Sequence, residues 1–179
     1  MKATETRIAG VYLLEPTVFG DERGYFFESF NATRFEQLTG CKPHFVQDNQ
    51  SLSAKGVLRG LHFQLAPKAQ GKLVRVVQGA VFDVAVDIRK NSPTWGQWVG
   101  YELNARNHHQ LWIPPGLAHG FVTLEDNTLF QYKVTDVWSK EHERCIAWND
   151  PELAIDWHFE GTPLVSDKDA LGHLLRDFA

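Results

Sequence analysis

The chain has 179 residues, a length that suits one domain, and we expect a single domain over residues 1–179. Its 18 Lys and Arg are mixed with 22 Asp and Glu, which argues against the continuous basic surface that nucleic-acid binding requires. Two widely separated cysteines, and no secretory or membrane-length apolar run, predict a protein of the reducing cytoplasm that does not enter a membrane.

Strand-like runs bounded by Gly, Pro and Asp recur at short intervals between Arg7 and Trp138. The clearest of them are residues 25–30, 56–64, 72–78 and 82–89. Many short strands in one chain are typical of a β-sandwich or β-barrel, so the sequence predicts a mainly β fold. No repeat, linker or low-complexity segment interrupts this pattern.

Residues 32–39 are predicted to form a helix, because Asn31 is placed to cap its first turn and Gly40 follows its last residue. A second helix is expected to close the chain after Ser166. Both are short, so the strands provide the framework.

The run of residues 82–89 alternates between apolar and polar side chains, apart from Ala85. Its even positions are apolar, whereas Asp83, Asp87 and Arg89 occupy odd positions. Such alternation predicts a strand with one buried face and one wetter face.

His62 lies in the run 56–64, where strict alternation would place it on the opposite face from Arg59. Gly60 lies between them, and a glycine inside a strand often marks a bulge. We expect such a bulge to shift the register and to direct Arg59 and His62 into the same cavity. Without this context, a single histidine on a strand is more often a hydrogen-bonded structural residue than a base.

Lys72 shares a strand face with Val74 and Val76, which is unusual unless that face opens into a pocket. The alternative is a lysine at a strand end whose ammonium group extends into water. The sequence leaves both alternatives open.

Pro114, Gly116 and His119 have the PxGxxH spacing of the second cupin motif, and residues 56–79 occupy the place of the first. The chain therefore resembles a cupin, which implies a jelly-roll β-barrel with a few short peripheral helices. Metal-binding cupins usually carry a His-x-His pair and a Glu in the first motif. Here the pair reads His62-Phe63-Gln64 and residues 56–79 contain no Glu, so we predict no metal.

Seven motifs occur together in the order in which one enzyme family carries them. They are residues 21–28, 47–51, 56–64, 70–74, the segment ending in His119, 131–133 and 166–169. On these residues the chain resembles the dTDP-4-dehydrorhamnose 3,5-epimerases across nearly its whole length. The resemblance implies conversion of dTDP-4-dehydro-6-deoxy-D-glucose to dTDP-4-dehydro-L-rhamnose by inversion at C3 and C5. Both protons are alpha to the C4 ketone, so a base and an enolate-stabilising cation suffice, and no cofactor is expected.

The same resemblance implies four catalytic residues. His62 would be the base, and Asp169 would hold its imidazole in one tautomer. Lys72 would face the C4 oxygen as it becomes negative, and Tyr132 would return a proton from the opposite side. From the residues alone, Asp169 is better explained as an acidic residue in a helix capped by Ser166, and Tyr132 as an aromatic packed on a strand.

The resemblance also implies a set of substrate contacts along the chain. They are Arg23, Phe26, Glu28, Gln47, Asn49, Arg59, His119, Trp138, Glu143 and Lys168. Arg23 and Arg59 are the expected pyrophosphate ligands, because a guanidinium group matches phosphate oxygens. His119 would hydrogen-bond the sugar instead of a metal.

Trp138 would stack on thymine, at a position where many members of the family carry Tyr. It follows Tyr132 by six residues in a strand-like run, so unbroken alternation would point both side chains to one face. Homologous barrels pair as homodimers that exchange N-terminal strand residues. Arg23 and Glu28 therefore serve either their own site or that of the neighbour.

Three alternatives to a 3,5-epimerase remain open from the sequence. One is an epimerase that inverts only C3 or only C5, because such enzymes share the pocket. Another is a metal-dependent cupin enzyme that uses His62, Gln64 and His119. The last is a sugar-nucleotide binding module without catalysis, for which the aromatic and arginine residues would suffice.

Overall fold

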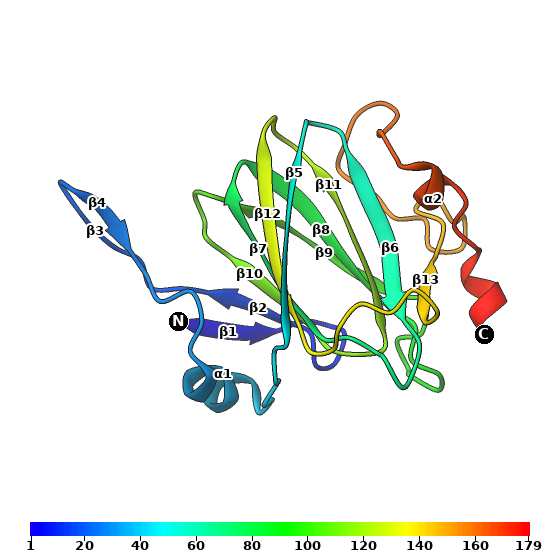
Figure 1. Cartoon of the computed structure of the whole chain (residues 1–179), viewed down its shortest axis with the longest axis horizontal. Coiled ribbons are helices and arrows are strands. Elements are labelled where there is room, and N and C mark those ends of the chain that lie inside the picture. Colours follow the sequence, from blue (N-terminus) through cyan, green and yellow to red (C-terminus); the bar gives the residue numbers. More distant parts are fainter.

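The computed structural model describes residues 1–179, and two antiparallel sheets that face each other make up most of it (Figure 1). One sheet has six strands, in the spatial order β1 (Lys2–Glu5), β2 (Tyr12–Glu15), β10 (Gln110–Ile113), β7 (Lys72–Gln78), β12 (Thr128–Val134) and β5 (Gln47–Ser53). The other has five, in the order β13 (Glu143–Cys145), β6 (Leu58–Gln64), β11 (Leu117–Thr123), β8 (Ala80–Asp87) and β9 (Trp98–Asn104). Several strands that are consecutive in sequence, such as β6 and β7 or β10 and β11, lie in different sheets. This repeated crossing between layers confirms the predicted jelly roll.

The hydrophobic core has three parts. The space between the sheets is filled by side chains from both layers, among them Val74, Val76, Phe121 and Phe130. A second cluster lies on the other face of the five-stranded sheet, where the C-terminal segment packs against it through residues such as Trp157. A third lies between the six-stranded sheet and helix α1 (Ala32–Thr39). The five-stranded sheet is therefore covered on both faces, and α1 covers part of the outer face of the six-stranded sheet.

This two-sided cover explains why the expected wetter face of residues 82–89 is wrong. Every residue of β8 is buried, and the side chains of Asp83 and Asp87 are 0% exposed. Asp83 shares the space between the sheets with Val81 and Ala85, whereas the even positions pack under the C-terminal segment. Asp87 is satisfied locally, by a salt bridge of 2.7 Å to Arg89 and by two neighbouring hydroxyl groups.

Helix α1 has the predicted bounds and caps. The Asn31 side chain accepts a hydrogen bond from the Arg34 backbone N–H, and Gly40 adopts a left-handed φ of 70° just past the last residue. The second predicted helix is short, since α2 spans only Asp167–Ala170 and is followed by the 3-10 helix η1 (Leu175–Phe178). None of these helices has the length and apolar character that crossing a membrane would require.

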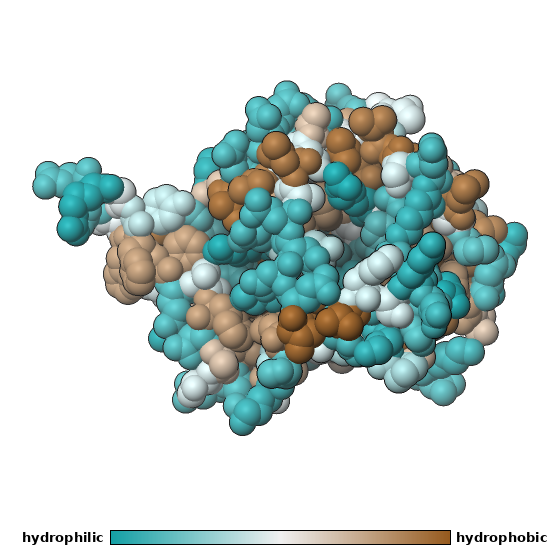
Figure 2. Space-filling model, in the orientation of Figure 1, coloured by the Kyte–Doolittle hydropathy of each residue, from teal (hydrophilic) through white to brown (hydrophobic).

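The strand predicted at residues 25–30 is only partly correct, because β4 (Gly24–Phe26) ends early. It pairs with β3 (Phe19–Asp21) in an isolated hairpin that projects from the barrel (Figure 1). The chain then turns back, and Phe30 packs against the cluster beneath α1. Figure 2 shows hydrophilic residues at the hairpin tip, while Phe19 and Phe26 near its base are 65% and 71% exposed.

The bulge expected at Gly60 is present. His62 pairs with His119 of β11, but Arg59 pairs with Phe121, so β6 has one more residue than β11 over this stretch. Gly60 has φ 130°, and a Cβ atom there would lie 2.5 Å from the Gly120 Cα atom. The bulge turns Arg59 and His62 toward the same cavity, as predicted.

We predict that Gly60→Ala lowers the free energy of unfolding by about 3 kcal/mol, because it adds a backbone clash to an unfavourable φ. Gly161→Ala is the control: φ is 96° there, but no atom lies within 4 Å of the added Cβ. Urea denaturation should show a loss of about 1 kcal/mol for the control. Equal losses in the two variants would contradict the proposed role of the clash.

Candidate functional site

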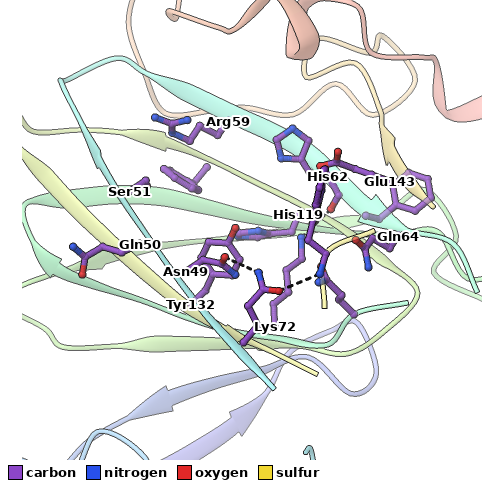
Figure 3. A pocket seen from close by; sticks show the side chains of 15 residues that line it. Asn49, Gln50, Ser51, Arg59, His62, Gln64, Lys72, His119, Tyr132 and Glu143 are labelled. Carbon is purple, nitrogen blue, oxygen red and sulfur yellow. Dashed lines mark hydrogen bonds between the residues drawn. The ribbon is translucent and has the colours of Figure 1, made fainter. Parts of the chain in front are cut away.

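A cavity of about 530 Å³ lies between the two sheets, at one end of the barrel (Figure 3). Its lining comes from β5, β7 and β12 of one sheet and from β6, β11 and β13 of the other. The lining residues are Gln47, Asn49, Gln50, Ser51, Arg59, His62, Phe63, Gln64, Gln70, Lys72, His119, Phe121, Tyr132, Trp138 and Glu143. Along β7 the inward residues change from Lys72 to Val74 and Val76, so the interior is polar at the cavity and apolar beyond it.

His62 and Asp169 form a short contact at the wall of this cavity. The His62 Nε2 and Asp169 Oδ1 atoms are 2.5 Å apart, and the Gly60 backbone N–H donates to Oδ2 at 3.3 Å. Burial favours a higher pKa for Asp169, but its hydrogen bond to His62 and the nearby positive charge lower the pKa below its usual value. The ionised carboxylate accepts the Nε2 proton, which leaves Nδ1 as an acceptor with no partner in the chain.

The backbone of Asp169 fits the capped helix expected from the sequence, while its side chain contacts His62. Its backbone N–H donates to the Ser166 Oγ atom at 3.1 Å, so Ser166 caps α2 as predicted. Its side chain, which is 3% exposed, is turned away from the helix end toward His62. The cap therefore orients the residue whose carboxylate contacts the imidazole.

Lys72 faces the cavity and does not extend into bulk water. Its side chain is 6% exposed, and Nζ donates to the His62 backbone carbonyl at 3.1 Å. Burial lowers the pKa of Lys72 to about 8, although the charges of Asp83 and Glu143 act in the opposite direction. A buried ammonium group of this kind is a ready partner for a developing negative charge.

Tyr132 lines the same cavity from the opposite sheet. It lies on β12, in register with Val74 of β7, whereas His62 lies on β6 (Figure 3). Burial and the charge of Glu143 raise the pKa of Tyr132, while Arg59 opposes this shift. The phenol therefore keeps its proton. The cavity thus has a proton acceptor on one side and a proton donor on the other.

A second histidine–carboxylate pair lies deeper in the barrel. The His119 Nε2 and Asp83 Oδ2 atoms are 2.9 Å apart, and both side chains are buried. Burial lowers the pKa of His119 more than the adjacent Asp83 raises it. Asp83 is not among the site residues predicted from the sequence. An acidic residue that shares a strand face with Val81 and Ala85 is the signal that could have identified it.

The three metal ligands considered from the sequence, His62, Gln64 and His119, each form hydrogen bonds to other groups of the protein. The His62 and His119 Nε2 atoms each contact their own carboxylate, Asp169 and Asp83. The Gln64 side chain is occupied by three backbone groups: it donates to the carbonyls of residues 68 and 137 and accepts from the N–H of residue 139.

The mouth of the cavity carries the predicted nucleotide contacts. Gln47 donates to Asn49 at 2.8 Å and accepts from the Trp138 backbone N–H at 3.1 Å. Trp138 is 56% exposed and lies beyond the end of β12 at Val134, so the expected unbroken strand from Tyr132 to Trp138 is wrong. Both aromatic side chains nevertheless reach the cavity.

One hydrogen-bonded pair and one salt bridge organise this region. Arg59 contacts the Ser53 Oγ atom through its guanidinium group. Lys168 does not line the cavity itself but forms a salt bridge of 2.7 Å to Glu143, which does. Burial favours a higher pKa for Glu143, but its hydrogen bond to Lys168 and that positive charge lower it.

Besides Asp169 and Lys168, three predicted residues lie outside the cavity of their own chain. Arg23 is at the tip of the projecting hairpin, where it pairs with Asp21, and Phe26 is on β4. Glu28 follows the hairpin and accepts a hydrogen bond from the Asn31 side chain. The structure therefore does not bring these residues to His62 within one chain.

Known proteins are similar to this chain over nearly its whole length. A family model described as dTDP-4-dehydrorhamnose 3,5-epimerase matches residues 5–177. A protein of that name from Pseudomonas aeruginosa is 59% identical, over 99% of this chain and 97% of its own length.

Solved structures are also similar to this chain. A dTDP-6-deoxy-D-glucose-3,5-epimerase from Legionella pneumophila, in complex with dTDP-4-keto-L-rhamnose, has a TM-score of 0.94 and 52% identity, covering 98% of this chain and 93% of that one. A 3′-monoepimerase from Streptomyces bikiniensis, in complex with dTDP-quinovose, has a TM-score of 0.90 and 32% identity, covering 96% and 86%.

We predict that Lys72→Met raises the free energy of unfolding at pH 7 by about 1 to 3 kcal/mol, because it removes a buried charge. Since the pKa of Lys72 falls from 10.5 to about 8 on folding, the unfolded chain binds more protons between these values. The wild-type protein therefore gains stability as pH rises through this window, and the difference should vanish above it. Denaturant unfolding at pH 7 and pH 10.5 measures the effect.

Lys90→Met is the matched control, because Lys90 is exposed. Its effect should stay within about 0.5 kcal/mol at both pH values. A destabilised Lys72→Met protein would show that the ammonium group is a net stabilising element.

Proposed function

This chain belongs to the dTDP-4-dehydrorhamnose 3,5-epimerase family, and from that premise we propose how its cavity performs the reaction. The enzyme is an isomerase that converts dTDP-4-dehydro-6-deoxy-D-glucose to dTDP-4-dehydro-L-rhamnose by inverting C3 and C5. The observation that carries the mechanism is that His62 and Tyr132 line one cavity from opposite sheets.

The chemistry requires only proton transfers. The C4 carbonyl acidifies the protons on both C3 and C5, so removing either one gives a planar enolate. Inversion follows when a proton is added to the opposite face. No electrons leave the substrate, so a base, an acid and a positive charge near O4 are sufficient.

His62 is the base in this proposal. Its Nε2 proton is donated to Asp169, so the Nδ1 lone pair accepts the proton from the sugar carbon. The resulting imidazolium lies against the ionised Asp169 carboxylate, which stabilises it. A positioned general base of this kind contributes about 10² to 10⁴ in rate.

Lys72 stabilises the enolate oxygen at C4. The ammonium group is buried, so its interaction with a developing negative charge is stronger than it would be in water. Loss of one such donor typically costs about 10² to 10³ in rate.

Tyr132 donates the proton that completes inversion. Its position on β12, across from His62 on β6, supports delivery to the other face of the ring. The raised pKa of the phenol keeps it protonated and ready to donate.

The nucleotide occupies the mouth of the cavity. Trp138 presents an exposed aromatic plane on which thymine stacks, and the Arg59 guanidinium group contacts the pyrophosphate. The polar contacts to nucleotide and sugar come from Gln47, Asn49, His119, Glu143 and Lys168.

A second copy of the chain completes the site. Arg23, Phe26 and Glu28 lie in or beside the projecting hairpin, and the exposed aromatic side chains there lack a cover within the chain. In a homodimer the hairpin would reach the partner's cavity, with Arg23 as a pyrophosphate ligand. An exposed apolar hairpin next to a charged tip supports this arrangement (Figure 2).

Incubation with dTDP-4-dehydro-6-deoxy-D-glucose in D2O should load deuterium at both C3 and C5, as measured by NMR. His62→Ala should lower this exchange by about 10³ or more, because no other base faces the sugar. Tyr132→Phe should retain exchange but lose inversion, because His62 returns the deuteron to the same face.

Deuterium at a single carbon would identify a single-position epimerase such as the similar Streptomyces bikiniensis enzyme. Normal dTDP binding by His62→Ala without any exchange would exclude a binding module.

Mixing Arg23→Ala with His62→Ala subunits tests the shared site. A heterodimer would contain one site with both wild-type residues, so random pairing of two inactive variants should restore about a quarter of the sites. Activity after co-refolding measures this, with each variant refolded alone as the control. No recovery, or a monomer by light scattering, would show that Arg23 is not exchanged.

A further inference from the structure

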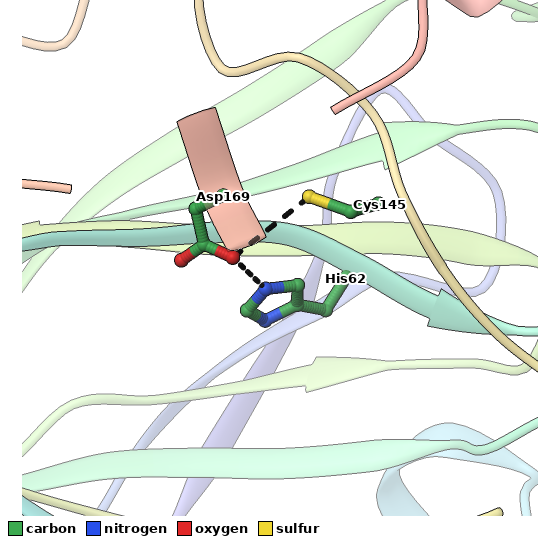
Figure 4. Close-up of side chains that lie close together, drawn as sticks. All are labelled: His62, Cys145 and Asp169. Atoms are coloured by element: carbon green, nitrogen blue, oxygen red, sulfur yellow. Dashed lines mark hydrogen bonds and ion pairs between the residues drawn. The ribbon is translucent and has the colours of Figure 1, made fainter. Parts of the chain in front are cut away.

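The thiol of Cys145 lies beside the His62–Asp169 pair, and the proposed reaction does not use it (Figure 4). Cys145 is on β13, directly in register with His62 on β6. Its Sγ atom is 3.9 Å from Asp169 Oδ1, the same oxygen that lies 2.5 Å from His62 Nε2. The three donor atoms all lie within 4.8 Å of one another, and no other His, Cys, Asp and Glu side chains form such a group.

We propose that His62 Nε2, Cys145 Sγ and Asp169 Oδ1 form a binding site for one thiophilic divalent cation, Zn²⁺ or Cd²⁺, whose binding switches the enzyme off. The binding is independent of the reaction. The inhibition rests on the proposed role of His62 as base.

Binding of a cation requires only small movements of the three ligand atoms. Zinc bonds of about 2.0 to 2.3 Å place the ligand atoms of a tetrahedral site about 3.5 Å apart. The His62–Asp169 contact must therefore open by about 1 Å, and the sulfur must move inward by about 1 Å. Three protein ligands with a fourth position left for water are a common zinc arrangement.

The charge balance selects the class of cation. A thiolate and a carboxylate together neutralise a divalent ion, which matters at a site where Cys145 is 8% and Asp169 3% exposed. Burial raises the pKa of Cys145 to about 12, so the cation must displace the thiol proton, which leaves to solvent as the metal–sulfur bond forms. Only a cation with strong affinity for sulfur offsets that cost, which excludes Mg²⁺ and Ca²⁺.

Inhibition follows from the tautomer of His62. A cation on Nε2 uses that lone pair and separates the ring from the Asp169 carboxylate. The single proton of the neutral imidazole must then reside on Nδ1. Nδ1 is the atom that accepts the substrate proton, so the metallated ring cannot act as a base.

Cys41 provides a matched control within the chain. It is the other free cysteine, and its Sγ atom contacts the Thr39 carbonyl oxygen at 3.6 Å, next to the end of α1. It belongs to no group of potential metal ligands. Cys41→Ser should therefore bind metal as the wild-type protein does.

The test is a titration with Cd²⁺, monitored by the ultraviolet charge-transfer absorption of a cadmium thiolate and by cadmium NMR, with Zn²⁺ in a parallel calorimetric titration. Wild type and Cys41→Ser should bind one ion, lose exchange at C3 and C5 in step with binding, and recover when EDTA is added. Cys145→Ser and Cys145→Ala should lose the absorption and require at least ten-fold more metal for inhibition.

Thiolate absorption that persists in the Cys145 variants, or disappears in Cys41→Ser, would overturn the site. Catalysis that continues in the metal-saturated wild type would overturn the inhibition. The wild-type cadmium signal tests the site even if both Cys145 variants fail to fold. It also tests the site if the protein does not turn over the sugar, so failure of the site and failure of the proposed function give different results.

Discussion

The hydrogen bond between His62 and Asp169 joins two parts of the chain that are 107 residues apart, and the site depends on it. One partner comes from the bulged strand β6, the other from the first turn of α2 near the C-terminus. Removing the imidazole would leave the buried Asp169 carboxylate without its shortest hydrogen bond, and such a loss typically costs about 1 to 3 kcal/mol or more. The C-terminal segment therefore covers the outer face of the five-stranded sheet and also sets the tautomer of the histidine.

The jelly roll suits the proposed proton transfers because its two sheets form opposite walls of one cavity. Residues that alternate along β6 and β12 point inward from opposite layers, so an imidazole and a phenol meet across one space without any long loop. The interior also holds Lys72, Asp83 and His119, charged or polar groups that a core would otherwise exclude. His119 and Asp83 pair with each other, and Lys72 donates to a backbone carbonyl beside the polar cavity, which lowers the cost of burying them.

Local sequence signals predicted the local features well. Asn31 and Gly40 define both ends of α1, because capping depends on a few neighbouring backbone groups. Gly60 predicted the bulge that brings Arg59 and His62 together, since only a residue without Cβ fits next to Gly120. For Lys72 the sequence left a pocket and a solvent-exposed strand end equally open, and only the structure shows that its side chain faces the cavity.

The sequence by itself determined the period of each strand, the ends of the helix and the residue types available for proton transfer, because these depend on neighbours within a few positions. Only the tertiary structure decided that Asp83 and Asp87 are buried, because that required the opposing sheet on one side and the C-terminal cover on the other. It also decided that β4 ends at Phe26 and that Trp138 reaches the cavity from a loop. Such outcomes follow from which distant segments pack together, and alternation along one strand carries no information about that.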